Sequence, residues 1–397
     1  MEHINVSRMV KQKINFTKIR FNQMKRIIII SNYSSTLINF RGHLLKTLVN
    51  KGYEVMAIAP HDEHADTVSN QLKKIGVLFK NYSLSRGSLN FLREYNSYCA
   101  IRDIIKNYKP HIVIAYTVKP VIYTGIAMRY FSEVKYYPLI TGLGYGFTEG
   151  GGVKRNFIRQ IMIFLYKRAL KYTYRIIFQN TDDKNLFHKL KIVPDNVKTN
   201  IIHGSGVDLK NFPLRFLPKK PVFLMLARLL VDKGVREYVE AARIVKSQFP
   251  NAVFQLAGRI DSNPSSISFN ELNLHIKEGF IEYLGEISSV QKSLAACRFY
   301  VLPSYREGTP RSVLEALATG RPIITTDVPG CRETVIHGKN GLLVAPRDSR
   351  SLAYAMVKLL KETDDKIESM SRESYILAKK KYDVKKVNKN LIDILNL

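Results

Sequence analysis

The sequence predicts an α/β protein built from two doubly wound parallel sheets. Three observations support this prediction. Short apolar runs, typical of strands buried in parallel sheets, alternate along the chain with helical patterns. The alternation occurs twice, on either side of a Pro- and Lys-rich segment at Phe212–Pro221. The 397 residues suffice for two domains of ordinary size, each with its own core.

The first array begins after a basic stretch without an apolar segment, which we expect to be a disordered leader over residues 1–23. A strand over Arg26–Ser31 is followed by a loop over Asn32–His43 and then by a helix. Further strands are predicted at Glu54–Pro60, Val77–Leu84, His111–Thr117, Tyr136–Thr141 and Arg175–Gln179. Ligands of such sheets bind at the carboxyl ends of the strands. The segments of interest are therefore Asn32–Gly42, Thr117–Pro120, Thr141–Gly152 and Gly204–Asp208.

The second array follows the Pro- and Lys-rich segment. Its predicted strands are Val222–Ala227, Ala252–Ala257, Ile281–Leu284, Phe299–Leu302, Pro322–Thr326 and Gly341–Val344, and its predicted helices include Arg236–Ser247 and Val290–Ala296. The chain ends in a helical pattern over Ala378–Leu397. We therefore expect a first domain over residues 24–212, a second over 213–377 and a terminal helical segment over 378–397.

A strand, a tight loop and a helix are predicted at the centre of this second array. Thr309 suits the N-cap, Pro310 suits the first helical position, and Gly320 can end the helix in a left-handed conformation. Free N–H groups at a helix start attract anions such as phosphate, and Glu315 can reach a group attached to that anion. A structural alternative stays open, in which Glu307 caps the helix and Glu315 lies on a solvated face.

Two cations lie at the carboxyl end of the first strand of this array. Arg228 and Lys233 are five residues apart, and together they can grip a diphosphate from two sides. Two solvated surface cations are the alternative, which a loop at the end of a buried strand makes less favourable.

Two further segments of the first array bear on a partner. The glycine-rich segment Thr141–Gly152 is either a bent connection or a mobile substrate loop, and its aromatic content favours substrate contact. Val153–Arg175 is predicted to be a long basic helix. It is either a core helix with a solvated basic edge or a surface that contacts anionic lipid headgroups.

Charge and composition narrow the classes of partner. The formal net charge is +29, and residues 1–205 carry 32 Lys and Arg against 12 Asp and Glu, whereas residues 206–397 carry 30 against 21. Such a field favours nucleic acid, an anionic membrane surface or phosphorylated substrates. The three cysteines are far apart, which fits a reducing compartment and gives no zinc spacing. No transmembrane run, signal peptide, G-x-G-x-x-G fingerprint or nucleic-acid-binding module is recognisable.

Taken together, the chain from Met24 onwards resembles the retaining glycosyltransferases of the GT4 family. The resemblance depends on Arg228 with Lys233, on Glu307 and Glu315 as an E-x7-E pair, and on the segment Val328–Val344. It implies the GT-B fold, in which two Rossmann-like domains face a central cleft. The order and spacing of these blocks carry the resemblance, since none of them would do so alone.

The resemblance implies a nucleotide diphosphate sugar, expected to be UDP-linked, as the donor. Arg228 and Lys233 would neutralise the charge that develops on the leaving diphosphate, and Glu307 would contact the donor sugar. The implied donor-binding residues are Arg228, Lys233, Gly308, Thr309, Pro310 and Glu315, and the implied catalytic residues are Glu307, Lys233 and Arg228. The family's reaction keeps the anomeric configuration, and no metal or other cofactor is expected.

Within the family, two segments are similar to bacterial enzymes that build lipid-linked oligosaccharides. These segments are Asn39–Gly42 and Ile140–Phe147. The most similar type transfers N-acetylgalactosamine in α-1,3 linkage to undecaprenyl-diphosphate-linked diacetylbacillosamine. Many relatives have a histidine where this chain has Ala115–Pro120, so Lys119 is a candidate to replace it or to meet the acceptor diphosphate. The candidate acceptor residues are Asn39, Arg41, Gly42, Lys119, Gly142 and Tyr145.

The leading hypothesis is therefore a cytoplasmic enzyme bound peripherally to the inner face of the cell membrane. It would use a UDP-sugar and a polyprenyl-diphosphate-linked acceptor. A soluble member of the same family with another UDP- or GDP-sugar and a small or polysaccharide acceptor is the alternative. A nucleic-acid-binding protein is the rival from another class, but no sequence module supports it.

Overall fold

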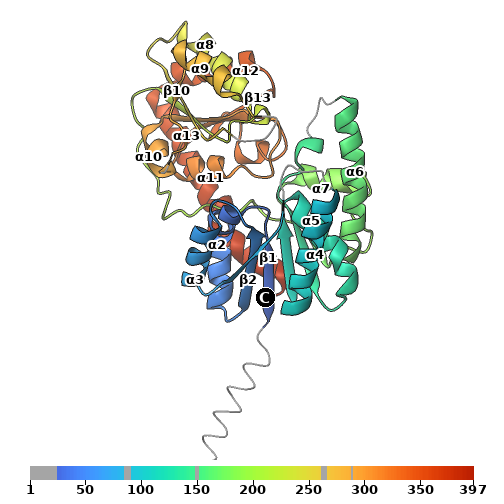
Figure 1. Ribbon diagram of the computed structural model, residues 1–397. Coiled ribbons are helices and arrows are strands. Elements are labelled where there is room, and N and C mark those ends of the chain that lie inside the picture. Colours follow the sequence, from blue (N-terminus) through green and yellow to red (C-terminus); the bar gives the residue numbers. More distant parts are fainter. Residues whose placement is uncertain (1–24, 85–90, 148–151, 261–265, 288) are drawn as a thin grey trace, which may run out of the picture. The chain divides into compact units, whose positions relative to one another are not determined.

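The computed structural model describes residues 25–84, 91–147, 152–260, 266–287 and 289–397, and Figure 1 shows their helices and strands. The leader expected over residues 1–23 lies outside the described residues, as do residues 148–151 of the glycine-rich segment. The described chain forms two sheets with parallel pairings, each accompanied by helices. The predicted fold class is confirmed.

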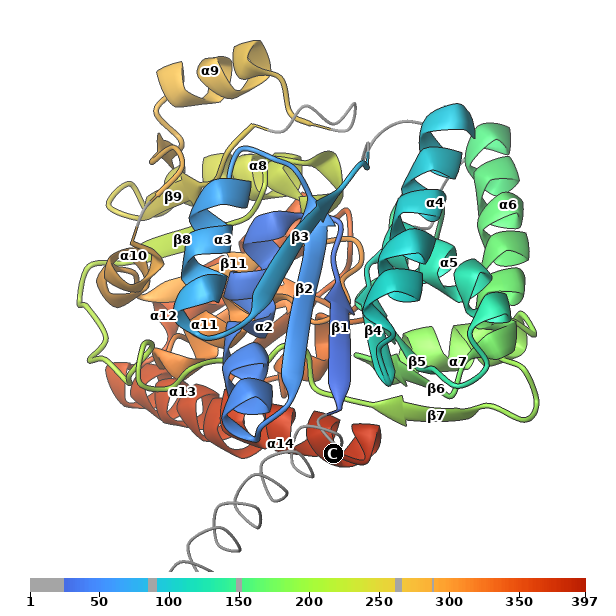
Figure 2. The same cartoon turned by 60° about the horizontal axis from the view of Figure 1, so that its bottom comes forward.

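The first sheet has the strand order β3-β2-β1-β4-β5-β6-β7. Its strands are β1 (Arg26–Ile30), β2 (Glu54–Pro60), β3 (Leu78–Tyr82), β4 (Ile112–Tyr116), β5 (Lys135–Ile140), β6 (Arg175–Phe178) and β7 (Lys198–Ile201). The central strands β1 and β4 are buried almost throughout, whereas the edge strand β3 is largely exposed and β7 has no fully buried residue. This is the burial expected when helices cover both faces of a parallel sheet. Figure 2 shows β1, β2 and β3 side by side, with α2 (Ser34–Asn50) and α3 (Ala65–Lys74) packed beside them.

The second sheet has the strand order β10-β9-β8-β11-β12-β13, and all its pairings are parallel. Its strands are β8 (Val222–Leu226), β9 (Val253–Ala257), β10 (Glu282–Tyr283), β11 (Phe299–Leu302), β12 (Ile323–Thr326) and β13 (Gly341–Val344). The order reverses between β8 and β11, so the crevice for a ligand is expected where these two strands end.

The remaining helices complete the alternation. Those of the first half are α4 (Phe91–Tyr108), α5 (Val118–Ala127), α6 (Val153–Ala169) and α7 (Thr181–Lys189). Those of the second half are α8 (Val235–Lys246), α9 (Phe269–Lys277), α10 (Val290–Ala296), α11 (Arg311–Ala318), α12 (Ser349–Lys361), α13 (Asp364–Leu377) and α14 (Val384–Leu395). The chain divides into two compact units, Met1–Pro138 with Arg168–Arg175, and Leu139–Lys167 with Ile176–Leu397.

The helix after β1 begins ten residues earlier than the sequence predicts. We expected a loop over Asn32–His43, but α2 starts at Ser34. The carboxylate of Asp62 accepts hydrogen bonds from the Ser34 backbone N–H, at 2.8 Å, and from its hydroxyl. A residue 28 positions away thus accepts from a backbone N–H in the first turn of the helix, and a local sequence pattern cannot reveal such a partner. The predicted loop was therefore wrong.

Two other helix boundaries differ from the prediction. The basic helix expected over Val153–Arg175 ends at Ala169 and continues as a 3-10 turn to Tyr172, because Arg175 already belongs to β6. The terminal pattern expected over Ala378–Leu397 is a π-helical turn, Ala378–Tyr382, followed by α14.

Gly42 lies inside α2, where glycine is a poor helix former. A Cβ added there would meet its nearest atom, Cγ2 of Ile38, at 4.0 Å, so an alanine fits without strain. We expect Gly42→Ala to raise the free energy of unfolding by roughly 0.5–1 kcal/mol, measured by urea denaturation. A lower unfolding free energy for the variant would contradict this packing of α2.

Candidate functional site

The site lies where β8 and β11 end, at the reversal of strand order in the second sheet. Residues 227–234 follow β8, and residues 303–310, the β11–α11 loop, follow β11. The two segments are in direct contact, since the Tyr305 N–H donates to the Asp232 carbonyl at 2.9 Å. Gly234 has a φ of +76°, and a Cβ there would lie 2.1 Å from the Pro303 carbonyl oxygen. Only glycine therefore permits this approach.

Lys233 and Glu307 form an ion pair across these two segments. The Lys233 ammonium donates to Oε1 of Glu307, and the Ser304 hydroxyl donates to the same oxygen at 2.7 Å. Both charged side chains are mostly buried. Glu307 does not cap α11, so the structural alternative for this residue is wrong.

Helix α11 begins at Arg311, with Pro310 at the N-cap. The predicted N-cap at Thr309 and helical start at Pro310 were therefore displaced by one residue. The Thr309 hydroxyl instead donates to the Gln179 carbonyl at 3.3 Å, so it is turned away from the first turn of the helix. The predicted end is confirmed, because Gly320 has a φ of +80°.

Glu315 is a buried residue of α11, which excludes the solvated face considered above. The Arg311 guanidinium donates to Oε1 of Glu315 at 2.7 Å, one helical turn away. Burial raises the pKa of Glu315, and the neighbouring Arg311 charge opposes that rise. A carboxylate held in this way can accept hydrogen bonds from ligand hydroxyl groups.

Arg228 is exposed at the beginning of the segment that carries Lys233. Its carbonyl accepts from the Leu230 N–H at 2.7 Å, which bends the backbone after β8. The structure thus joins Lys233 and Glu307 directly and places Arg228 on the same segment as Lys233.

The β11–α11 loop is enclosed on two sides. A Cβ on Gly308 would lie 2.1 Å from the Thr141 carbonyl oxygen and 2.7 Å from Oε1 of Gln179. On the other side, a Cβ on Gly330 would lie 2.3 Å from the Glu307 carbonyl oxygen. Gly142, one of the candidate acceptor residues, also lies against this loop, since its Cβ would come 3.4 Å from the Gly308 nitrogen.

Two residues in contact with this loop were not assigned from the sequence. Asn180 is the N-cap of α7, and its Nδ2 donates to the Gly308 carbonyl at 2.9 Å. Asp183 is fully buried and forms an ion pair with Arg306 of the loop. Burial raises the pKa of Asp183, while Arg306 and the hydrogen bond from Asn180 oppose the rise. The acidic first turn after β6 predicts a helix cap, but not these long-range partners.

The other candidate acceptor residues lie in or near the first sheet. Arg41 is buried in α2 with its guanidinium 5.2 Å from the centre of the Tyr116 ring. Asn39 is exposed, and with Gly42 and Arg41 it lies in α2 rather than in the predicted loop. Lys119, in the first turn of α5, donates to Glu94 at 2.8 Å. The backbone of Tyr145 lies in a 3-10 turn, Tyr145–Phe147.

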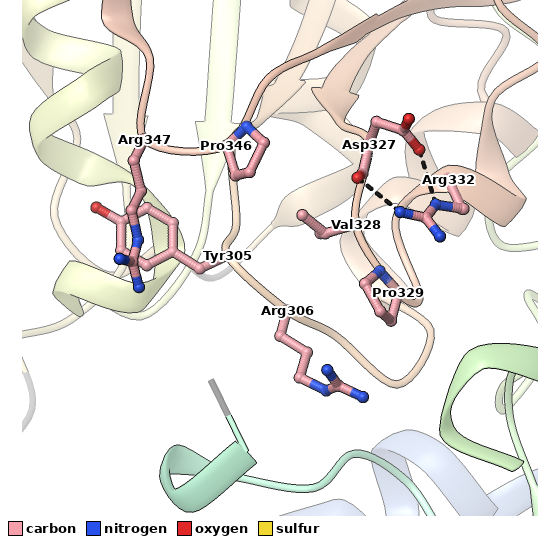
Figure 3. Close-up of a pocket in the computed structure, with 8 residues that line it drawn as sticks. All are labelled: Tyr305, Arg306, Asp327, Val328, Pro329, Arg332, Pro346 and Arg347. Atoms are coloured by element: carbon pink, nitrogen blue, oxygen red, sulfur yellow. Dashed lines mark hydrogen bonds and ion pairs between the residues drawn. The ribbon is translucent and has the colours of Figure 1, made fainter. Parts of the chain in front are cut away.

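One pocket of about 190 Å³ opens among the loops that follow β11, β12 and β13. Figure 3 shows its lining, with the Arg347 guanidinium over the Tyr305 ring, 4.7 Å from its centre. Arg332 and Asp327 both line the pocket and form an ion pair, and Arg332 also pairs with Asp182. The residues predicted to bind the donor do not line it. Because its arginines are matched by nearby carboxylates or an aromatic ring, we assign it no ligand.

Two features are absent from the residues that the structure describes. These residues contain no group of three or more His, Cys, Asp or Glu side chains placed to hold a metal ion. Among them, no helix has both the length and the apolar character needed to cross a membrane.

Two family models match the chain. The model described as "Glycosyl transferase 4-like" matches residues 7–180, and the one described as "Glycosyl transferases group 1" matches residues 220–362. The chain is 31% identical over 352 residues to the Campylobacter jejuni N,N'-diacetylbacillosaminyl-diphospho-undecaprenol alpha-1,3-N-acetylgalactosaminyltransferase, covering 85% of this chain and 90% of the relative. It is 26% identical to the Escherichia coli UDP-Gal:alpha-D-GlcNAc-diphosphoundecaprenol alpha-1,3-galactosyltransferase, over 70% of this chain and 73% of the relative.

Solved structures share the architecture at lower identity. Sucrose-phosphate synthase from Thermosynechococcus elongatus superposes with a TM-score of 0.78 at 18% identity, covering 94% of this chain and 98% of that chain. Anabaena HepE in complex with UDP-glucose superposes with a TM-score of 0.73 at 17% identity, covering 94% and 99%. At these identities the likeness bears on the fold.

Proposed function

Because this chain belongs to the GT4 family of glycosyltransferases with the GT-B fold, we propose that it transfers a sugar from a UDP-sugar to an undecaprenyl-diphosphate-linked saccharide. N-acetylgalactosamine is the sugar we propose first, and the assembly of bacterial surface or glycoprotein glycans is the proposed setting. Two relatives named for transfer to diphospho-undecaprenol acceptors support this acceptor class.

The observation that carries the proposal is the Lys233–Glu307 pair beside the start of α11. A lysine ammonium has three donors, so Lys233 can hold Glu307 and a phosphate oxygen at the same time. We assign Lys233 and Arg228 to the donor diphosphate, where they stabilise the negative charge that develops as it leaves. Glu307 then lies beside the departing sugar, and its position is fixed by Lys233 and Ser304.

The rest of the donor fits the same end of the sheet. The N–H groups of Gly308 and Thr309 lie just before α11, where the helix dipole favours an anion. Glu315, one further turn along, is assigned to the ribose hydroxyls. In our proposal the product keeps the donor's anomeric configuration, and a phosphate oxygen receives the acceptor proton.

A donor screen tests this assignment. Purified protein is incubated with a panel of UDP- and GDP-sugars, and the release of nucleoside diphosphate is measured. We expect UDP-N-acetylgalactosamine to be the best substrate. Selective turnover of a GDP-sugar would favour the alternative, a soluble GT4 enzyme with a different donor and a small or polysaccharide acceptor.

Helix α6 supports attachment to an anionic membrane surface. It exposes large apolar side chains, with Val153, Phe157 and Phe164 exposed to 87%, 67% and 55%. Exposed cations follow at Lys167 and Arg168, and no acidic residue occurs between positions 150 and 181. An apolar face with a basic margin suits an interface of acyl chains and anionic headgroups, where each cation contributes about 1 kcal/mol.

Substitution of the two phenylalanines tests the attachment. We expect the wild-type protein to float with liposomes that contain phosphatidylglycerol and not with pure phosphatidylcholine, because the cations need anionic headgroups. The double variant Phe157→Ser/Phe164→Ser should lose most of this flotation.

Helix α9 provides the matched control. It exposes Phe269 and Leu274 to 59% and 61%, but Glu271 and Glu278 balance its cations. Phe269→Ser/Leu274→Ser should therefore float like the wild type. Equal flotation of both double variants, or no lipid dependence in the wild type, would count against attachment through α6.

A further inference from the structure

The start of α7 makes a set of contacts with the β11–α11 loop that the proposed catalytic chemistry does not use. Asn180 Nδ2 donates to the Gly308 carbonyl at 2.9 Å and lies 3.5 Å from the Glu307 carbonyl oxygen. Asp183 accepts from Arg306, the residue before Glu307. Consecutive residues of the loop are thus held by one helix start.

These contacts are built rigidly into the protein. Asn180 and Asp183 are both buried, and they are bonded to each other twice. Oδ1 of Asn180 accepts from the Asp183 N–H at 2.7 Å, and Nδ2 of Asn180 donates to Oδ2 of Asp183 at 3.1 Å. The cap therefore fixes the amide of Asn180 with its donor side towards the loop.

The orientation of the loop peptides follows from this contact. The Gly308 carbonyl and the Thr309 N–H belong to one planar, trans peptide unit, so they point in opposite directions. Because Asn180 holds the carbonyl, the Thr309 N–H is directed away from α7. In the described part of the chain, neither the Gly308 nor the Thr309 N–H donates to a protein group. Such N–H groups remain available for an anion.

We propose that Asn180 and Asp183 are positioning residues that orient the Gly308–Thr309 peptide so that its N–H group, that of Thr309, binds the donor diphosphate. This inference rests on the proposed function. It assigns Asn180 no contact with the substrate, and its effect is transmitted through the Gly308 carbonyl. Asp183 contributes by holding both the Asn180 amide and Arg306.

Asn180→Asp keeps the capping oxygen but removes both donations of the amide, to Gly308 and to Asp183. The aspartate keeps the oxygen that accepts from the Asp183 N–H, but it places an oxygen where the amide donates to the Gly308 carbonyl. We expect the dissociation constant for UDP to rise by about tenfold, because a buried carbonyl loses its donor. The dissociation constant for uridine, which has no phosphate, should change by less than about twofold. Calorimetry measures both constants.

Asn340→Asp is the matched control. Asn340 is also buried, accepts from the Ile336 N–H and donates to a carbonyl, that of Thr334. The Asn340→Asp variant should have a lower melting temperature, but the ratio of its dissociation constants for UDP and uridine should be that of the wild type. If Asn180→Asp does not fold, Asn180→Ser is used instead. Its hydroxyl can still cap the helix, but the side chain is too short to reach Gly308. The same ratio of the UDP and uridine dissociation constants is measured.

The outcomes separate the two proposals. A wild-type protein that binds UDP no better than uridine would overturn the proposed function, and the positioning role with it. A wild type that prefers UDP, with an unchanged preference in both Asn180 variants, would overturn the positioning role alone.

Discussion

Lys233→Ala is expected to reduce kcat for sugar transfer by about 10²- to 10³-fold, the usual effect of removing one donor to a developing negative charge. Lys233 is the residue that joins Glu307 to the proposed diphosphate site. Lys233 and Ser304 both donate to the mostly buried Glu307 carboxylate, and the substitution leaves the Ser304 hydroxyl as the remaining donor of the two. Initial rates with saturating donor measure the effect.

A matched control separates charge from fold. Lys339 is exposed and forms an ion pair with the partly buried Glu373 at 3.2 Å. Lys339→Ala should therefore leave kcat within about twofold, since exposed pairs contribute little. A folded Lys233→Ala protein with nearly wild-type kcat would remove Lys233 from the reaction.

Gly308→Ala is expected to damage both stability and turnover. The added Cβ would lie 2.1 Å from the Thr141 carbonyl oxygen, so the β11–α11 loop has to move. Overpacking of this kind costs about 1–3 kcal/mol of unfolding free energy, and a shift of about 1 Å in a catalytic group can cost about 10²-fold in rate. Urea denaturation and initial rates measure the two effects.

Gly42→Ala serves as the comparison for stability, because the same substitution meets no close atom in α2. The sign of the change in unfolding free energy should be opposite for the two variants. Gly308→Ala with wild-type stability and rate would show that the loop is not enclosed as described.

The sequence is informative where one local cause decides the structure. The buried strands β1, β4, β8 and β11 are short apolar runs, and each was predicted within one or two residues. The edge strand β7 reads Lys198-Thr199-Asn200-Ile201 and was missed, because an edge strand without a fully buried residue has no apolar run.

Long-range contacts explain the remaining differences. Asp62 starts α2 early, so Asn39, Arg41 and Gly42 lie in a helix. Asn180 was open to prediction as a helix cap, but not as the partner of Gly308, which is 128 residues away. Arg321 is a fully buried cation that donates to the carbonyls of Cys297, Thr319 and Phe216. No local pattern indicates any of these partners.

Some residues of the candidate site could be predicted from the sequence, and others could not. The loops at the ends of β8 and β11 could be found from strand patterns and from the spacing of Lys233, Glu307 and Glu315. The acceptor residues could not be placed as securely, since they depend on how side chains from several elements are arranged. Lys119, for example, is paired with Glu94, which lies 25 residues earlier in α4.

Transfer of labelled N-acetylgalactosamine from its UDP donor to a short-chain polyprenyl-diphosphate saccharide tests the account most directly. We predict that the label enters the lipid fraction with the wild-type protein and with Lys339→Ala, and not with Lys233→Ala. The product linkage should have the α configuration of the donor. Transfer to water-soluble saccharides alone, or equal transfer by the Lys233→Ala protein, would contradict the account.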